Sequence, residues 1–236
     1  MSAIELRLGQ RPDEAGPPIS AGPQSYSFEV TAQLTADAEG IIARYPQARS
    51  ALLPLLHLVQ AQDGYLTPAG VRFCAAQLDL SPAEVTAVAT FYSMYRRNPT
   101  GDYLVGVCTN TLCAIMGGDA LLEILQEHLG VHAGDTTPDG SVTLEHIECN
   151  AACDFAPVVM VNWEFFDNQT PSSVRELVDD LRAGKPVQPS RGATLCTFRQ
   201  TARILAGVED ATIGAPDTSP PGPATLAGLR VVRGQR

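Results

Sequence analysis

The segment Tyr103-Leu-Val-Gly-Val-Cys108-Thr-Asn-Thr-Leu-Cys113 decides how the rest of the chain is interpreted. An apolar, strand-like run leads into Cys108, and four residues separate that cysteine from Cys113. A second pair follows in Glu148-Cys149-Asn-Ala-Ala-Cys153, with three residues between its members. Four cysteines in two pairs suit an iron–sulfur cluster, a zinc ion or a pair of disulfides.

The composition is that of a globular protein, which we expect in the cytoplasm. Of the 236 residues, 44% are hydrophobic and 18% are charged, which is typical of a chain with a sizeable core. No apolar run is long enough to cross a membrane, and the first residues lack the pattern of a signal peptide. In a reducing compartment, paired cysteines are metal ligands or redox groups more often than structural disulfides. Cys74 and Cys196 lie outside the pairs and are expected to be ordinary small side chains.

Around the paired cysteines, the pattern predicts a small α/β domain over residues 99–188. Short apolar or alternating runs predict four strands, and amphipathic runs predict two helices. The order β-α-β-β-β-α fits a thioredoxin-like fold with a small mixed sheet. The strands are expected at 103–108, 141–148, 156–161 and 163–167, and the helices at 117–130 and 171–181.

The two cysteine pairs follow consecutive predicted strands. Cys108 ends the first strand, and Cys149 follows the second. In an open α/β sheet, functional groups gather in the loops beyond the strand ends. We therefore expect the pairs to meet at one edge of the domain, each on its own loop. That arrangement suits a two-iron cluster, which needs four thiolates.

Residues 31–98 are predicted to form a bundle of short helices. The first helix is expected to start at Thr35 or Asp37. A stronger start signal is Ser81 followed by Glu84, which together form a capping box. Apolar side chains behind it recur at helical spacing and are expected in a core or an interface: Val85, Val88, Phe91, Tyr92 and Tyr95. Further helix starts are expected at Ser50 and at Thr67-Pro68.

The two ends differ from the body in composition. Residues 1–30 are rich in Pro and Gly, which predicts a flexible arm, and residues 189–236 are a basic extension. From residue 184 onward, seven Lys and Arg face three acids, a net +4; because the whole chain carries −10, residues 1–183 carry −14. An acidic body argues against nucleic acid and anionic lipid as partners. The basic tail is expected either to pack along another protein or to stay solvated.

The spacing of the cysteines indicates which metal or cluster the four thiols suit best. Structural zinc usually sits in Cys-x2-Cys knuckles, which gaps of four and three residues fit less well. Thioredoxin-type dithiol chemistry calls for Cys-x-x-Cys, and plant-type ferredoxins use Cys-x4-Cys-x2-Cys with a distant fourth cysteine; both spacings are absent. A two-iron cluster is favoured, and zinc remains the alternative.

The neighbours of the cysteines predict a low reduction potential. Small residues, among them Asn110 and Ala151, allow backbone N–H groups to approach the cluster sulfurs, and such hydrogen bonds help set the potential. Carboxylates oppose the extra negative charge of a reduced cluster. The nearby acids are Glu145, Glu148 and Asp154.

Motifs for other chemistry are missing from the sequence. No Gly-x-Gly-x-x-Gly, Walker phosphate loop or His-Glu-x-x-His occurs, and the four histidines are scattered. We therefore expect no catalytic residue and no NADH or flavin site on this chain. These are the features of an electron carrier within a larger assembly.

Several stretches resemble a known family. They are Leu53-Pro-Leu-Leu-His-Leu-Val-Gln60, Val85-Thr-Ala-Val-Ala-Thr-Phe-Tyr92, Val107-Cys-Thr-Asn-Thr-Leu-Cys-Ala114 with Gly117-Gly118, and Glu148-Cys-Asn-Ala-Ala-Cys-Asp-Phe-Ala-Pro157. The family is that of the two-iron, thioredoxin-like ferredoxin subunits (the E subunits) of NADH–quinone oxidoreductase, respiratory complex I. The similarity covers roughly residues 28–184.

The resemblance implies a site, a cofactor and partners. Four thiolates would ligate one [2Fe-2S] cluster in a thioredoxin-like ferredoxin fold. A neighbouring subunit would hold FMN and the NADH site, and the large iron–sulfur subunit would be a second partner. The chain would reach the inner face of the cell membrane only through the complex, an NADH-oxidising, quinone-reducing translocase. The implied ligands are Cys108, Cys113, Cys149 and Cys153.

Two other functions compete with this hypothesis. The same subunit type occurs in NAD-linked hydrogenases and formate dehydrogenases, where it would be part of the diaphorase. A zinc-stapled interaction protein without redox work is the alternative from another class.

Overall fold

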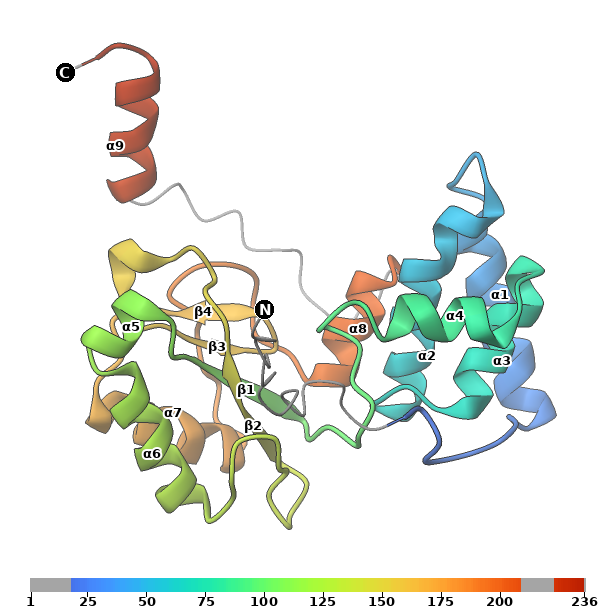
Figure 1. The fold of residues 1–236 in the computed structure, drawn as a ribbon, viewed down its shortest axis with the longest axis horizontal. Helices are drawn as coiled ribbons and strands as arrows, with labels where there is room; N and C mark the ends of the chain where they lie inside the picture. Colours follow the sequence, from blue (N-terminus) through green and yellow to red (C-terminus); the bar gives the residue numbers. More distant parts are fainter. Residues whose placement is uncertain (1–17, 209–222, 236) are drawn as a thin grey trace, which may run out of the picture. The chain divides into compact units, whose positions relative to one another are not determined.

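The computed structural model describes residues 18–208 and 223–235, and the chain divides into two units, Met1–Asn98 and Pro99–Arg236 (Figure 1). The described part of the first unit is helical and contains no strand. This confirms the predicted helical bundle ahead of the α/β domain. Its elements are α1 (Phe28–Ile42), η2 (Ala48–Ala51), α2 (Leu52–Asp63), α3 (Pro68–Leu78) and α4 (Pro82–Ala89).

Helix α1 begins earlier than predicted. Ser27 is its N-cap, and the Ser27 Oγ accepts a hydrogen bond from the backbone N–H of Val30 at 3.3 Å. Thr35 and Asp37 lie inside the helix, so the expected start at either residue was wrong. The start also falls within the residues assigned to the N-terminal arm. A serine upstream satisfies the free N–H groups of the first turn as well as the predicted caps would.

Two of the other helix starts in this unit agree with the sequence signals. The start expected at Ser50 was wrong, because Ser50 lies in η2 and α2 begins at Leu52 after Ala51, without a side-chain cap. Thr67 caps α3 through a hydrogen bond from Gly70, with proline at the first helical position. Ser81 and Glu84 form the expected capping box at α4. Both caps are local patterns of side chain and backbone, so a few residues of sequence suffice to recognise them.

The segment after α4 is fixed onto α2 by buried polar groups. The buried Gln60 side chain donates to the carbonyl of Met94 at 3.1 Å and accepts from the N–H of Arg96 at 2.7 Å. The Tyr95 hydroxyl donates to the Leu53 carbonyl at 2.9 Å. Tyr95 is thus a core residue; the sequence had predicted either a core or an interface for these aromatic side chains.

The second unit contains the predicted mixed sheet. Its strands are β1 (Tyr103–Cys108), β2 (Val142–Ile147), β3 (Val159–Val161) and β4 (Glu164–Phe166), in the spatial order β2-β1-β3-β4. β1 pairs in parallel with β2 and antiparallel with β3, and β3 pairs antiparallel with β4. Together with the helices α6 (Gly118–Leu129) and α7 (Pro171–Arg182), this confirms the β-α-β-β-β-α order.

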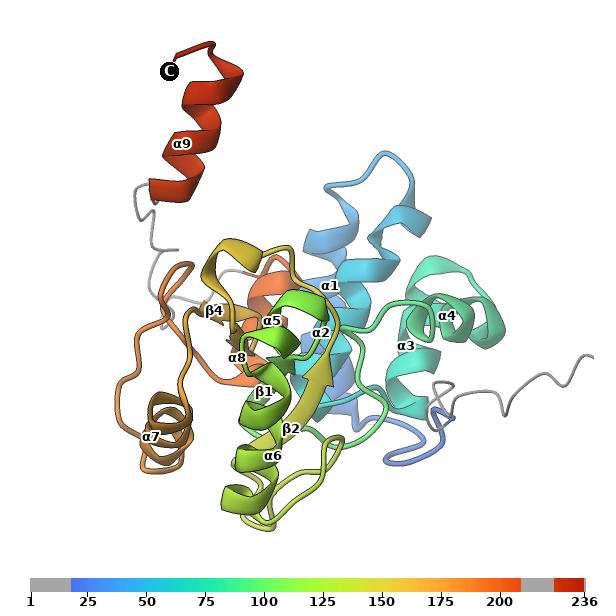
Figure 2. The ribbon, with the colours of Figure 1, turned by 60° about the vertical axis from the view of Figure 1, so that its left-hand side comes forward.

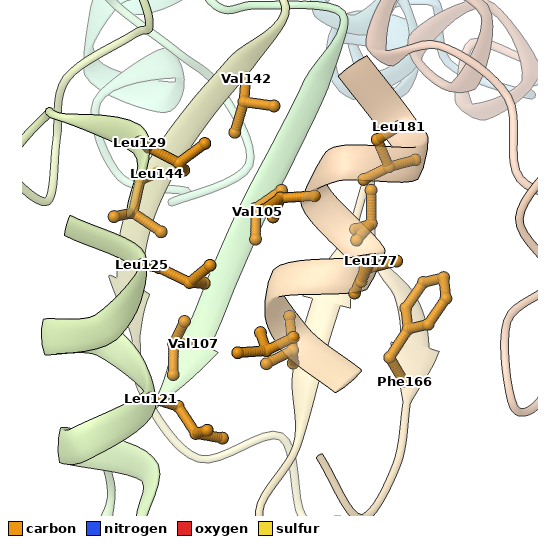
Figure 3. Close-up of a cluster of buried hydrophobic side chains, with 14 residues drawn as sticks. Val105, Val107, Leu121, Leu125, Leu129, Val142, Leu144, Phe166, Leu177 and Leu181 are labelled. Atoms are coloured by element: carbon orange, nitrogen blue, oxygen red, sulfur yellow. The ribbon is translucent and has the colours of Figure 1, made fainter. Parts of the chain in front are cut away.

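Helices α6 and α7 lie side by side against one face of the sheet (Figures 1 and 2). Figure 3 shows leucines of both helices directed toward valines of β1. Alternate residues of β1 face this layer because side chains of a strand alternate between its two faces. The fully buried members of the layer include Val105, Val107, Leu125, Leu144, Val174 and Val178.

The C-terminal extension is partly built into this unit. Phe198 starts helix α8 (Phe198–Leu205), is fully buried, and packs on Trp163 with ring centroids 5.4 Å apart. The buried Asn162 accepts from the N–H of Leu104 at 2.8 Å and donates to the carbonyl of Cys196 at 2.8 Å. The chain up to α8 therefore belongs to the fold of the second unit.

Besides α8, two further helices were not predicted. α5 (Thr111–Ile115) is a single short turn, and α9 (Pro223–Val232) follows the undescribed residues 209–222. α9 exposes the apolar side chains Leu226 and Leu229 together with the basic Arg230. Within the described ranges, every helix lacks the length and apolar character that a membrane span requires.

Candidate metal centre

The four paired cysteines come from the ends of β1 and β2, as predicted. Cys108 is the last residue of β1, Cys113 lies on α5, and Cys149 follows β2. Cys153 begins a short 3-10 turn, η3 (Cys153–Phe155). The second member of each pair is thus carried by a helical turn, where the sequence had suggested plain loops.

The first pair is the buried half of the site. Cys108 is 3% exposed and Cys113 4% exposed, and both pack with Ala152 and Val158. Burial raises the pKa of the Cys113 thiol to about 11, and the neighbouring Cys108 thiol adds to the rise. The backbone N–H of Val158 donates to Cys113 and acts in the opposite direction. A cation at this position would remove the thiol proton on binding, because thiolate is the ligand form.

The second pair is the exposed half. Cys149 and Cys153 are both solvent-exposed. The pKa of Cys153 is raised by a hydrogen bond with Cys149 and by the electrostatic interaction between these two thiols, with smaller contributions from desolvation, Cys108 and Asp154. The thiols therefore interact within each pair, and Cys153 also interacts electrostatically with Cys108 and Cys113 of the other pair.

Backbone and side-chain donors surround the second pair. The N–H of Ala151 donates to the Cys149 sulfur at 3.3 Å, and Ala151 holds the left-handed backbone (φ 53°) that presents this N–H to the sulfur. The Asn110 amide caps α5 through Thr111 and donates to Glu148 at 2.8 Å. Asn110 thereby ties the loop of the first pair to the loop of the second.

The candidate site can be tested for its fit to an iron–sulfur cluster. Asn150 lies in the loop that joins Cys149 to Cys153; its side-chain Nδ2 is buried, and within the described chain it has no hydrogen-bond partner. A buried donor of this kind is costly unless an acceptor is present, and a cluster sulfide is such an acceptor. The donor set of four thiols with neighbouring N–H groups therefore fits the group. As they stand, no three His, Cys, Asp or Glu side chains in the described ranges are grouped to hold a single metal ion.

The other cysteines lie in different settings. Cys74 is fully buried in α3, which raises the pKa of its thiol far above the ordinary value. The Cys196 sulfur lies 3.2 Å from the hydroxyl of Thr201 in α8. Neither residue belongs to the group of paired thiols.

Sequence reasoning missed two kinds of contributor to the site. Asn110 was noted for its small size, but its role as a bridge depends on a glutamate that is distant in sequence. Phe155 and Phe165 pack against the buried group that contains the first cysteine pair. The Phe155 ring follows Cys153 closely in sequence, whereas Phe165 reaches the site only through the pairing of β3 with β4.

The sequence of this chain is similar to those of known proteins. The sequence model of the thioredoxin-like [2Fe-2S] ferredoxin family matches residues 38–182. The E subunit of NADH-quinone oxidoreductase from Mycobacterium tuberculosis is 66% identical over 233 residues, covering 98% of this chain and 91% of that protein. NADH-quinone oxidoreductase subunit 2 of Thermus thermophilus is 37% identical over 153 residues, covering 64% of this chain and 84% of that protein.

A solved structure shows the same fold at lower identity. The NAD+-reducing [NiFe]-hydrogenase in its air-oxidized state matches with a TM-score of 0.52 and 21% identity, over 57% of this chain and 23% of that one. The likeness is one of fold. From the family match and the extent of the mycobacterial identity, the chain belongs to the thioredoxin-like [2Fe-2S] ferredoxin family, among the relatives of the E subunit of NADH-quinone oxidoreductase.

Proposed function

We propose that this chain is the two-iron electron-transfer subunit of an NADH–quinone oxidoreductase. The observation that carries the proposal is the pairing of four thiols at one edge of a thioredoxin-like sheet, within a chain 66% identical to a mycobacterial E subunit. Cys108 and Cys113 would bind one iron, and Cys149 and Cys153 the other. The pairing of the thiols in the structure, two by two, supports this division.

When bound, the cluster would take up one electron at a time and release it again. The residues of this chain hold it and adjust its surroundings. Val158 and Ala151 direct N–H groups at sulfur ligands, and these hydrogen bonds favour the more negatively charged state. Asp154 and Glu148 act in the opposite direction because their charge opposes added electrons. A low potential remains our expectation.

The exposed half of the site is proposed as the face of electron exchange. Cys149 and Cys153 are exposed, and the neighbouring helix α5 exposes Ile115 (76%), with Met116 (55%) directly after it. Large apolar side chains grouped around a redox site indicate a surface that another protein covers. The FMN- and NADH-binding subunit is the proposed partner there, and the large iron–sulfur subunit is a further proposed partner.

The helical unit offers a second apolar surface. A groove of about 550 Å³ lies between the start of α2 and the end of α4, lined by Leu53, Val88, Phe91 and Tyr92. Phe91 is 79% exposed, which favours an interface over a core for this side chain. We propose that the same complex covers this groove, and that the chain reaches the inner face of the cell membrane through it.

The cluster assignment is tested on the anaerobically purified full-length protein. We expect about two irons and two acid-labile sulfides per chain, a visible absorption band, and an EPR signal after reduction. Cys113→Ala should lose or degrade the cluster, whereas Cys74→Ala should leave it intact. A colourless protein with stoichiometric zinc, or equal loss in both variants, would refute the assignment.

The setting of the chain is tested separately. Affinity purification of the chain from its own cells should recover the flavin-containing subunit together with quinone-reducing components. Recovery of a hydrogenase or formate dehydrogenase catalytic subunit in their place would favour the diaphorase alternative.

A further inference from the structure

The segment after α7 forms an additional edge beside β4. The N–H of Ser190 donates to the carbonyl of Phe165 at 2.8 Å, and Arg191 pairs antiparallel with Phe165. The Ser190 hydroxyl accepts from the N–H of Asp167 at 2.9 Å, and the N–H of Ala193 donates to Glu164 at 3.0 Å. These bonds fix the backbone position of Arg191, which lies outside the residues that the family model matches.

The side chain of Arg191 is held by two aromatic rings and a carboxylate. Its guanidinium carbon lies 4.2 Å from the ring centroid of Phe165 and 5.0 Å from that of Phe155. Its Nη2 donates to Oδ1 of Asp167 at 3.1 Å, and its Nε lies 3.0 Å from Oδ2. The Asp167 side chain is only 9% exposed. A planar guanidinium suits this combination of stacking and paired oxygens better than an ammonium group does.

Both aromatic rings connect this cation to the candidate cluster site. Phe155 and Phe165 pack against the buried group that contains Cys108 and Cys113. Phe155 is also the last residue of η3, the turn that begins with Cys153. Arg191 therefore contacts two rings that pack against the cysteine group, and one of these rings belongs to the turn that begins with Cys153.

The charge of Arg191 matters because the identified neighbours of the thiols are acidic. Asp154 raises the pKa of Cys153, and Glu148 lies next to Cys149. A one-electron reduction adds negative charge to the pocket. A cation fixed behind these rings favours the reduced state, and because the Arg191 side chain is 39% exposed, solvent screens part of its effect.

We propose that Arg191 is a positioning residue for the cluster: it braces the Cys153 turn and, through its charge, raises the reduction potential. The inference rests on the proposed function, since it needs a bound cluster. It gives the first part of the C-terminal extension a role in the redox site. The partner carboxylate Asp167 orients the guanidinium and offsets part of its charge.

The test measures midpoint potentials by EPR-monitored redox titration and the half-time of cluster loss by absorption, on the full-length protein. Arg191→Gln removes the cation and leaves Asp167 unpaired, so its potential should shift to more negative values. Asp167→Asn removes the opposing charge, so its potential should shift to more positive values. Arg191→Lys keeps the charge but not the stacking, so its potential should stay nearer the wild-type value while its cluster is lost several-fold faster.

A matched control comes from another ion pair of the same unit. Arg182 donates to Asp139 at 2.8 Å, near the start of β2 and thus at the end of that strand remote from Cys149. Arg182→Gln should leave both readouts unchanged. If the midpoint potentials of Arg191→Gln and Asp167→Asn shifted in the same direction, or no more than that of the control, this inference would be overturned while the proposed function would stand. Absence of a cluster from the wild-type protein would overturn the proposed function as well.

Discussion

The Cα of Gly118 faces the carbonyl oxygen of Cys108 with no room for a side chain between them. A methyl group on Gly118 would also lie 2.9 Å from the carbonyl oxygen of Cys113. Both obstructing atoms belong to the backbone and cannot rotate away. The start of α6 therefore packs directly on the chain that presents the first cysteine pair.

Replacing Gly118 with Ala should damage the site without touching a proposed ligand. The added methyl would push α6 from the Cys108 backbone, and we expect a loss of about 2 kcal/mol in the free energy of unfolding. Cluster loss should be faster than in the wild type. Denaturant titration and absorption decay measure the two effects.

The matched control is Gly40→Ala in α1. A Cβ on Gly40 meets nothing within 4 Å, so this change should stabilise the helix by about 0.5–1 kcal/mol. Equal stability of the two variants would show that the contact at Gly118 has no effect.

Asn162 should be among the most sensitive positions in the second unit. Its buried amide satisfies Leu104, Asp102 and Cys196, and its backbone is left-handed (φ 47°). Asn162→Ala leaves three backbone groups short of a partner, so we expect a loss of about 3 kcal/mol in unfolding free energy. Asn168→Ala, at a less buried residue with a similar φ of 50°, should cost less than half as much. Thermal denaturation of both variants makes the comparison.

The helical unit should lose stability in mild acid through His57. Burial lowers the pKa of His57 to about 4, so the folded chain resists protonation that the unfolded chain accepts near pH 6.5. As the pH falls from 6.5 to 4, the unfolded state alone gains the proton, and up to about 3 kcal/mol of stability is lost. Urea titrations of wild type and His57→Gln at several pH values isolate this contribution. An identical pH dependence in the two proteins would contradict it.

The groove between α2 and α4 should contribute to assembly and not to folding. Phe91→Glu places a charge on a side chain that is 79% exposed, so the isolated protein should unfold at the same temperature. Association with the flavin-containing subunit should weaken by at least tenfold in a pull-down titration. Phe28→Glu, at an 84% exposed phenylalanine that does not line this groove, is the control and should bind normally.

The C-terminal extension should separate into two parts on truncation. A chain that ends at Val208 keeps the buried Phe198 and its N–H bond to the carbonyl of Asp102, so its melting temperature should not change. A chain that ends at Ser190 loses that aromatic anchor and should be destabilised by about 3–5 kcal/mol. Calorimetry of the two truncated proteins distinguishes the parts.

The features that the sequence predicted have local causes. The capping box at Ser81 and Glu84 lies within four residues, and the strand pattern before Cys108 needs only six. The helix starts at Thr67 and Ser81 and the order of elements along the second unit followed from such patterns. The assignment of the four cysteines as ligands stays a prediction, as do the division into four segments and the low potential.

Other features depend on partners far away in the chain. Asn162 lies in the turn between β3 and β4, and nothing in the local sequence indicates that its amide donates a hydrogen bond to the carbonyl of Cys196, 34 positions later. No sequence motif indicates the role of Arg191, because its neighbours Phe155 and Phe165 lie far from it in the sequence, in a turn and in a strand. α5 is too short for a helical period to appear in the sequence. At α1 the difficulty was different: several residues in this stretch can cap a helix, and Ser27 is the one that does.

The parallel pairing of β1 with β2 has a consequence for how the protein matures. Cys113 and Cys153 are 40 positions apart, and we expect them to interact only after this non-local pairing has formed. An unfolded chain offers two separate dithiols, whereas the folded chain offers four sulfurs at one edge. We therefore expect iron and sulfide to bind only after the sheet has formed.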